Sequence, residues 1–296
     1  ITNRCNLHCA GCDARANSLF DYEEAAALLT DEDWCRIFDE AAQMGVSFCL
    51  LAGGEPMLRR GVLECAAKRR EILFPVFTNG TLLSESMLEL IDQNRNLVPV
   101  VSMEGDEAQT DARRGAGTYS KLTANMERMR DRGILFGVSI TLTTENIQTV
   151  TGDAFLSLLR ALGAKVAFYV DYVPADAGTE SLAPGDAERA LLASRLETLR
   201  QKQDGMIYVS FPGDEQFSDG CLAAGRGFFH INPTGGAEPC PFSPVSDTNL
   251  KHTSLLAALD SPLFARLRAS ELLSGHHTGA CALFGKDEEL AAMCGK

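Results

Sequence analysis

Three cysteines stand at the start of the chain with the spacing C-x3-C-x2-C, namely Cys5, Cys9 and Cys12. A packed interior has little use for three small thiols this close together, because they cannot all face one core. A loop around a metal cluster does use this spacing, since each thiolate must reach the same inorganic core from a short turn. Three ligands leave one iron of a four-iron cluster open to a ligand that is not protein. The spacing therefore indicates chemistry rather than electron storage.

A second pattern, Gly53-Gly54-Glu55-Pro56, closes an apolar segment further along the chain. Paired glycines let backbone approach a ligand closely, and their carbonyls together with Glu55 can accept hydrogen bonds from an ammonium group. Alone, this would be an ordinary turn ahead of a helix. Zinc stays an alternative for the cysteines, with His8 as a fourth ligand, although its place between Cys5 and Cys9 makes convergence awkward.

Together the two patterns resemble the radical S-adenosylmethionine (radical SAM) superfamily. The resemblance implies a [4Fe-4S] cluster bound by the catalytic cysteines Cys5, Cys9 and Cys12, with S-adenosyl-L-methionine on the open iron. Reduction would then cleave S-adenosylmethionine to a 5′-deoxyadenosyl radical that abstracts hydrogen from the substrate. The resemblance also assigns the methionine-side contacts of the cofactor to Gly53, Gly54, Glu55 and Pro56.

Further cofactor contacts are implied by the resemblance at the ends of later strands. Thr78 and Asn79 match one strand end, and Ser102 would contact the ribose or methionine moiety. Arg114 would pair with the methionine carboxylate, and Ser139 is a weaker candidate; each could equally be a turn residue or a solvated group. One departure is that the family often has an aromatic residue beside the third cysteine, where this chain has Gly11 and Asp13.

The remaining cysteines suggest a second site near the carboxyl terminus. Cys221 and Cys240 follow the spacing C-x13-G-x4-C, which resembles the auxiliary-cluster module called SPASM or its shortened form, twitch. Cys281 and Cys294 complete the ligand set, which implies one auxiliary [4Fe-4S] cluster. A zinc site or one disulfide are the alternatives. We expect Cys35, Cys49 and Cys65 to be small core residues, and His230 to be a ligand, a proton donor or a structural histidine.

The elements that must position these residues alternate regularly. The fold class is α/β, a partial (βα)6 TIM-like barrel with right-handed crossovers and functional loops at the carboxyl ends of its strands. We expect its first strand to precede the cysteines and to be missing from a trimmed start. The expected strands are 46–52, 72–78, 98–103, 134–143 and 165–173, and the expected helices are 31–44, 62–71, 85–94, 118–132 and 147–162.

Two domains are expected, with a boundary near a Pro/Gly/Ala-rich stretch. Residues 1–180 would form the barrel. Residues 181–296 would form a linker helix, 186–203, and a small C-terminal cysteine-containing auxiliary iron–sulfur module. This module would contain a short strand at 207–211, a hairpin at 228–238 and helices at 253–259 and 263–271.

Composition limits the possible partners and compartments. The net charge of −13, from 27 basic and 40 acidic residues, argues against duplex nucleic acid. No apolar run approaches the length of a membrane span, so we expect no integral membrane protein. Ten cysteines are too few for a disulfide scaffold, and clustered cysteines favour metal binding in a reducing compartment. The expected localisation is cytoplasmic.

These observations predict a radical SAM oxidoreductase or maturase-type enzyme that modifies peptides or proteins or takes part in cofactor maturation. Its partners would be a reductant protein such as flavodoxin or ferredoxin and a peptide or small-molecule substrate. Sulfatase maturation is disfavoured because Pro241, not an acidic residue, follows Cys240. Alternatives are C–C bond formation on a small molecule or lipid and, from another class, a non-catalytic iron–sulfur electron carrier or metal-binding scaffold.

Overall fold

A parallel sheet forms the centre of the molecule. The computed structural model describes residues 1–12, 28–174, 178–218, 220–273 and 282–294. Five strands pair in chain order, each parallel to the next. The strand–helix alternation predicted the parallel arrangement and the first four of these strands. They are β1 (Phe74–Thr78), β2 (Leu97–Ser102), β3 (Gly137–Leu142), β4 (Val166–Asp171) and β5 (Ile207–Phe211).

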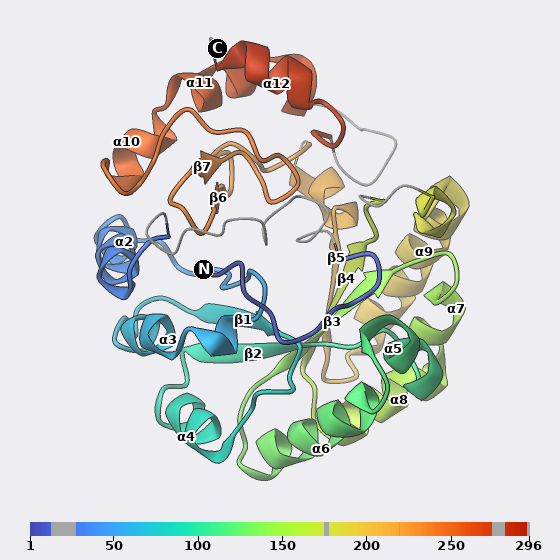
Figure 1. Ribbon diagram of the computed structural model, residues 1–296. Helices are drawn as coiled ribbons and strands as arrows, with labels where there is room; N and C mark the ends of the chain where they lie inside the picture. Colours follow the sequence, from blue (N-terminus) through green and yellow to red (C-terminus); the bar gives the residue numbers. More distant parts are fainter. Residues whose placement is uncertain (13–27, 175–177, 219, 274–281, 295–296) are drawn as a thin grey trace.

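Helices follow the strands and form an arc around one face of the sheet (Figure 1). Burial alternates along β4, where Ala167 and Tyr169 are buried and Phe168 is half-buried. Tyr169 Oη donates to Val150 O at 2.8 Å, so the buried set faces the helices. The half-buried set faces the concave side. Flanking the sheet are α2 (Asp31–Gln43), α3 (Arg60–Ala67), α4 (Glu85–Gln93), α5 (Glu107–Arg114), α6 (Thr118–Asp131), α7 (Ile147–Val150), α8 (Asp153–Leu162) and α9 (Asp186–Lys202).

Local signals explain most helix starts. Thr30 caps α2 in a capping box with Asp33. Helix α5 was not expected, although Asp106 caps it by accepting from Gln109 N at 2.9 Å. The expected helix 147–162 is split into α7 and α8 at Gly152. The missed helix matters because it carries Arg113 and Arg114.

The expected buried strand at 46–52 is not a regular strand. Isolated parallel bridges join Phe48 to Leu73 and Leu51 to Val76. Phe48 and Leu50 are 60% and 55% exposed, so the prediction of full burial was wrong. An apolar run predicts a buried strand only where both faces are covered. Here, within the described residues, the face that carries Phe48 and Leu50 is open.

Two of the cysteines expected in the core are joined. Cys35 on α2 and Cys65 on α3 form a disulfide, with their Cα atoms 5.2 Å apart. Cys49 is a free, half-buried thiol in the bridged segment before the Gly-Gly turn. The expectation of core residues is confirmed, because Cys65 is buried and Cys35 packs against the core. Sequence patterning could not tell that two helices bring these positions together.

The sheet continues beyond residue 180. Strand β5 pairs with β4 in parallel, from Val166↔Ile207 to Val170↔Phe211, after the crossover helix α9. The strand at 207–211 was expected in the auxiliary module, and its pairing instead extends the barrel sheet. The residue composition changes after α9. For this reason β5 was not recognised as a further strand of the same strand–helix alternation. The two-domain boundary at residue 180 stays a prediction.

The carboxyl-terminal residues pack beside α2. The hairpin of β6 (His230–Ile231) and β7 (Ala237–Glu238) is antiparallel, as predicted. Three helices follow, α10 (Leu255–Leu259), α11 (Pro262–Ala269) and α12 (Asp287–Met293). Glu40 on α2 accepts a hydrogen bond from Leu255 N at 2.7 Å. Figure 1 shows the first residues of the chain between this hairpin and β1.

None of the described helices combines the length and apolar character that a membrane crossing requires.

Candidate active site

The cysteine loop begins where the chain runs beside the Gly-Gly turn. Thr2 forms a parallel bridge with Gly53. Gly54 N donates to Thr2 O and Glu55 N donates to Arg4 O, both at 2.8 Å. The two sequence patterns are therefore joined by backbone hydrogen bonds.

The glycines are required by this close contact. Gly53 has φ +144°, and a Cβ there would clash with the carbonyl oxygen of Thr2. A Cβ on Gly54 would clash with the carbonyl oxygen of Arg4. The sequence predicted close backbone approach to a ligand, and the structure shows close approach of the chain segment that leads into Cys5.

Glu55 is fully buried beneath the turn. Its Oε1 accepts from Thr78 Oγ1 at 2.7 Å and from Met57 N at 2.9 Å, and its Oε2 accepts from Asn79 N at 2.7 Å. Burial raises the pKa of this carboxyl despite these donors. Both oxygens are engaged by protein, so Glu55 ties the turn to the end of β1. Pro56 begins the short 3-10 helix Pro56–Leu58.

Donors surround the sulfur atoms of the loop. Leu7 N lies 3.4 Å and Asn79 Nδ2 lies 3.9 Å from Cys5 Sγ. Arg114 Nη1 lies 4.0 Å from Cys9 Sγ. Cys5, Cys9 and Cys12 are all half-buried. N–H groups aimed at sulfur are the surroundings that iron–sulfur thiolates have, so this donor set fits a cluster.

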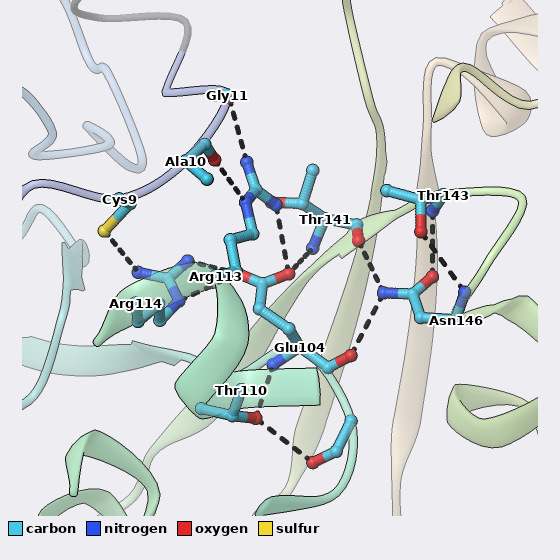
Figure 2. A network of polar contacts seen from close by, with 11 residues as sticks. Cys9, Ala10, Gly11, Glu104, Thr110, Arg113, Arg114, Thr141, Thr143 and Asn146 are labelled. Atoms are coloured by element: carbon cyan, nitrogen blue, oxygen red, sulfur yellow. Dashed lines mark hydrogen bonds and ion pairs between the residues drawn. The ribbon is translucent and has the colours of Figure 1, made fainter. Parts of the chain in front are cut away.

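A buried carboxylate organises the other side of the loop (Figure 2). Glu104 follows β2 and is 2% exposed. Its Oε1 accepts from Arg114 Nε at 2.8 Å, and its Oε2 accepts from Arg113 Nη1 and Thr141 N, both at 3.1 Å. Asn146 Nδ2 donates to Glu104 O at 3.0 Å. The network joins the ends of β2 and β3 to the cysteine loop.

The charges in this network support one another. Burial alone would raise the pKa of Glu104, but the charges of Arg114 and Arg113 hold it below its ordinary value. Burial opposes the charge of Arg114 as well. The Glu104 carboxylate and the nearby Cys9 nevertheless raise the pKa of Arg114. The network keeps a positive group beside the sulfurs.

The two predicted serine contacts share the concave face. Ser102 pairs with Ser139 in register, and Ser139 pairs with Phe168. Both serines are half-buried; Ser102 ends β2, and Ser139 lies within β3. Sequence reasoning placed Ser102 at a strand end and Ser139 on the following strand but missed the roles of Glu104, Arg113 and Tyr172. The only available signals were an acidic residue after a strand and an arginine next to Arg114.

The expected auxiliary ligands are only partly described. Cys221 and Cys240 are buried, Cys294 ends α12, and Cys281 lies outside the described residues. Throughout the described part of the chain, no three His, Cys, Asp or Glu side chains come close enough to share one metal ion. This holds for the cysteine loop as well, so the metal-binding role of Cys5, Cys9 and Cys12 rests on their spacing and surroundings.

One histidine in the carboxyl-terminal hairpin has a defined partner. His230 Nδ1 lies 2.7 Å from Glu238 Oε2. The other oxygen of Glu238 accepts from Asn232 Nδ2 at 2.6 Å. Such a carboxylate contact fixes the orientation of the imidazole. The structure shows a hydrogen-bonded histidine.

Solved structures share this fold. SuiB from Streptococcus suis, solved with S-adenosylmethionine, aligns over 90% of this chain and 66% of its own with a TM-score of 0.73 and 19% identity. A further structure of SuiB contains the precursor peptide SuiA. At this identity the likeness shows the fold.

Sequence relatives extend the comparison. AdoMet-dependent heme synthase from Methanosarcina barkeri is 30% identical over 93% of this chain and 85% of its own length. PqqA peptide cyclase from Granulibacter bethesdensis is 26% identical over 81% of this chain and 66% of its own. The family model that describes the radical SAM superfamily matches residues 1–155. The chain belongs to the radical SAM superfamily, whose members use a [4Fe-4S] cluster and S-adenosylmethionine.

Proposed function

We propose that this radical SAM enzyme modifies a peptide or protein or takes part in cofactor maturation. The observation that carries the proposal is the pairing of Thr2 and Arg4, which lead directly into Cys5, with residues 53–55 of the Gly-Gly turn. Relatives that span most of the chain support the substrate classes, since one is named a heme synthase and another a peptide cyclase.

Cys5, Cys9 and Cys12 would hold the cluster, and the bound cofactor would supply a carbon radical that takes hydrogen from the substrate. The Gly53–Gly54 carbonyls would receive the cofactor's ammonium group. Glu55 would act indirectly, because its carboxylate already holds Thr78 and Asn79 in place. Ser102 and Ser139 would meet the cofactor on the concave face, and Arg114 would meet its carboxylate.

An auxiliary [4Fe-4S] cluster held by Cys221, Cys240, Cys281 and Cys294 is part of the proposal. Its support is the spacing of these cysteines. A reductant protein such as flavodoxin or ferredoxin would deliver the electron. Iron counts of roughly eight per reconstituted chain would agree with two clusters, and roughly four would remove the auxiliary one.

The test is anaerobic reconstitution, reduction with dithionite and addition of S-adenosylmethionine. We expect 5′-deoxyadenosine to form and expect Cys9→Ala to abolish it. Cys49→Ala is the matched control, because this half-buried thiol lies outside the motif. A complete absence of the nucleoside in the unmodified protein would leave only the carrier or scaffold alternative.

Substrate class is tested by stimulation of the same reaction. An iron porphyrin that raises the rate of 5′-deoxyadenosine formation would support cofactor maturation. A peptide that raises the rate and changes its own mass would support peptide modification. Stimulation only by a small molecule or lipid would contradict both.

A further inference from the structure

The second half of the cysteine loop is held from α5. Arg113 donates from Nε to Ala10 O and from Nη2 to Gly11 O, both at 3.1 Å. In return, Ala10 N donates to Arg113 O at 2.9 Å. Ala10 and Gly11 are the two residues that separate Cys9 from Cys12. Figure 2 shows the Arg113 guanidinium reaching their carbonyl oxygens.

Arg113 is itself fixed in place. Its Nη1 donates to Glu104 Oε2 at 3.1 Å, and its guanidinium carbon lies 5.6 Å from the centre of the Tyr172 ring. Its side chain is 17% exposed. One planar group therefore contacts a carboxylate, two carbonyl oxygens and an aromatic ring. A lysine ammonium has a single compact charge and cannot reproduce this set of contacts.

Tyr172, directly after β4, closes the loop from another direction. Gly11 has φ +60°, and a Cβ there would lie 2.6 Å from Tyr172 Oη and 2.9 Å from a ring carbon. The ring thus fills the space that a side chain at position 11 would need. Tyr172 is 3% exposed, and its hydroxyl donates to Thr179 Oγ1 at 2.9 Å.

We propose that Arg113 and Tyr172 are positioning residues that clamp Ala10 and Gly11 and so set where Cys12 stands relative to Cys9. The inference rests on the proposed cluster-binding role of the loop. Thiolates bind one cluster only if they converge, and a two-residue connection with a left-handed glycine has many alternative shapes when nothing holds it. Neither clamp residue touches the reacting atoms.

The first test compares Arg113→Lys and Tyr172→Ala with Tyr172→Phe, which keeps the ring. Iron and sulfide per chain, the EPR spectrum of the reduced protein with and without S-adenosylmethionine, and the rate of 5′-deoxyadenosine formation are measured. We expect at least a threefold lower rate and a changed EPR line shape for the first two variants. Tyr172→Phe is expected within twofold of wild type. Arg128→Lys, on exposed α6, is the matched control.

A second test covers variants that fold poorly. Gly11→Ala should lose iron because its methyl group meets the Tyr172 ring, and adding Tyr172→Ala should recover part of that loss. Purely additive losses would overturn the clamp, as would normal iron content and spectra in Arg113→Lys and Tyr172→Ala. If Cys9→Ala also binds iron normally, the cluster site itself fails; if only the clamp variants behave normally, only the clamp fails.

Discussion

Glu104 lies between two consecutive arginines and is the most buried charged group of the network around the cysteine loop. A buried carboxylate stays charged only while positively charged partners lie beside it. The family resemblance pointed to Arg114, which ends α5. It could not point to Glu104, because an acidic residue after a strand is more often a solvated turn. The role of Glu104 depends on helix α5, which the sequence did not predict and which supplies both arginines.

We expect replacement of the Glu104 carboxylate to destabilise the protein. Glu104→Gln leaves two guanidinium groups without their shared counter-charge, so we expect a loss of about 3–5 kcal/mol in the free energy of unfolding. Urea unfolding of the apo-protein measures it. Glu85→Gln is the control, because Glu85 pairs with Arg128 and Arg132 at the exposed surface. A loss for Glu104→Gln as small as the control's would contradict the assigned role.

The same variant predicts a pH dependence. The pKa of Glu104 is lowered on folding from an ordinary value of 4.5. A lowered carboxyl pKa contributes stability that is fully present above the unfolded value and is lost as pH falls through the folded one. The difference between wild type and Glu104→Gln should therefore be constant above pH 4.5 and shrink below it. If the difference in the free energy of unfolding between the two proteins instead increased as the pH fell, the lowered pKa of Glu104 would be contradicted.

The Gly-Gly turn provides another prediction about a single residue. Gly54→Ala places a methyl group against the Arg4 carbonyl oxygen, so we expect a loss of about 1–3 kcal/mol or more. Gly185→Ala is the control, since its new methyl group would meet only the end of the flexible Glu188 side chain. Thermal unfolding of both variants is the measurement. Equal melting temperatures would mean that the turn relaxes without cost.

At the scale of elements, hydrophobic patterning predicted β1, β2, β3 and β4, whose residues are all buried or half-buried. It failed for residues 46–52, where an equally apolar run has one open face. It also failed to connect β5 with the sheet, since parallel pairing depends on the path of α9 rather than on any residue type. Periodicity reports how a segment is buried and says little about its neighbours.

The disulfide between α2 and α3 is a test of element packing. It closes a separation of 30 residues, so we expect it to contribute about 3–4 kcal/mol to stability. A reductant should lower the melting temperature of wild type and leave Cys35→Ala unchanged. Mass spectrometry of the non-reduced digest should find a peptide joining Cys35 and Cys65. Free alkylation of both thiols without reductant would contradict the pairing.

At the scale of the whole molecule, α2 connects the two ends of the chain. Glu40 binds Leu255 N at 2.7 Å across 215 positions, and Arg36 donates to Leu250 O. No local sequence pattern predicts a contact between residues so far apart in the chain. The hairpin and helices that it anchors were predicted, while their position against α2 was not.

Glu40→Ala should loosen the carboxyl-terminal helices without unfolding the sheet. The expected result is faster proteolysis near α10, because Leu255 N loses its acceptor at the start of that helix. Glu64→Ala is the matched control, since Glu64 makes only an exposed contact with Arg60 on α3. Equal cleavage rates for both variants would show that Glu40 does not hold the helix.

The contacts between the cysteine loop and α5 also constrain how the protein can mature. Ala10 and Arg113 stand 103 positions apart, and Gly11 meets Tyr172 from still further along the chain. Contacts between such distant positions form only after the intervening chain has closed its loops. The cysteine loop of a nascent chain therefore lacks these contacts until Arg113 and Tyr172 have been synthesised and the sheet has folded. Iron delivery should follow folding of the sheet, so that newly made protein passes through a folded, metal-free state before it becomes active.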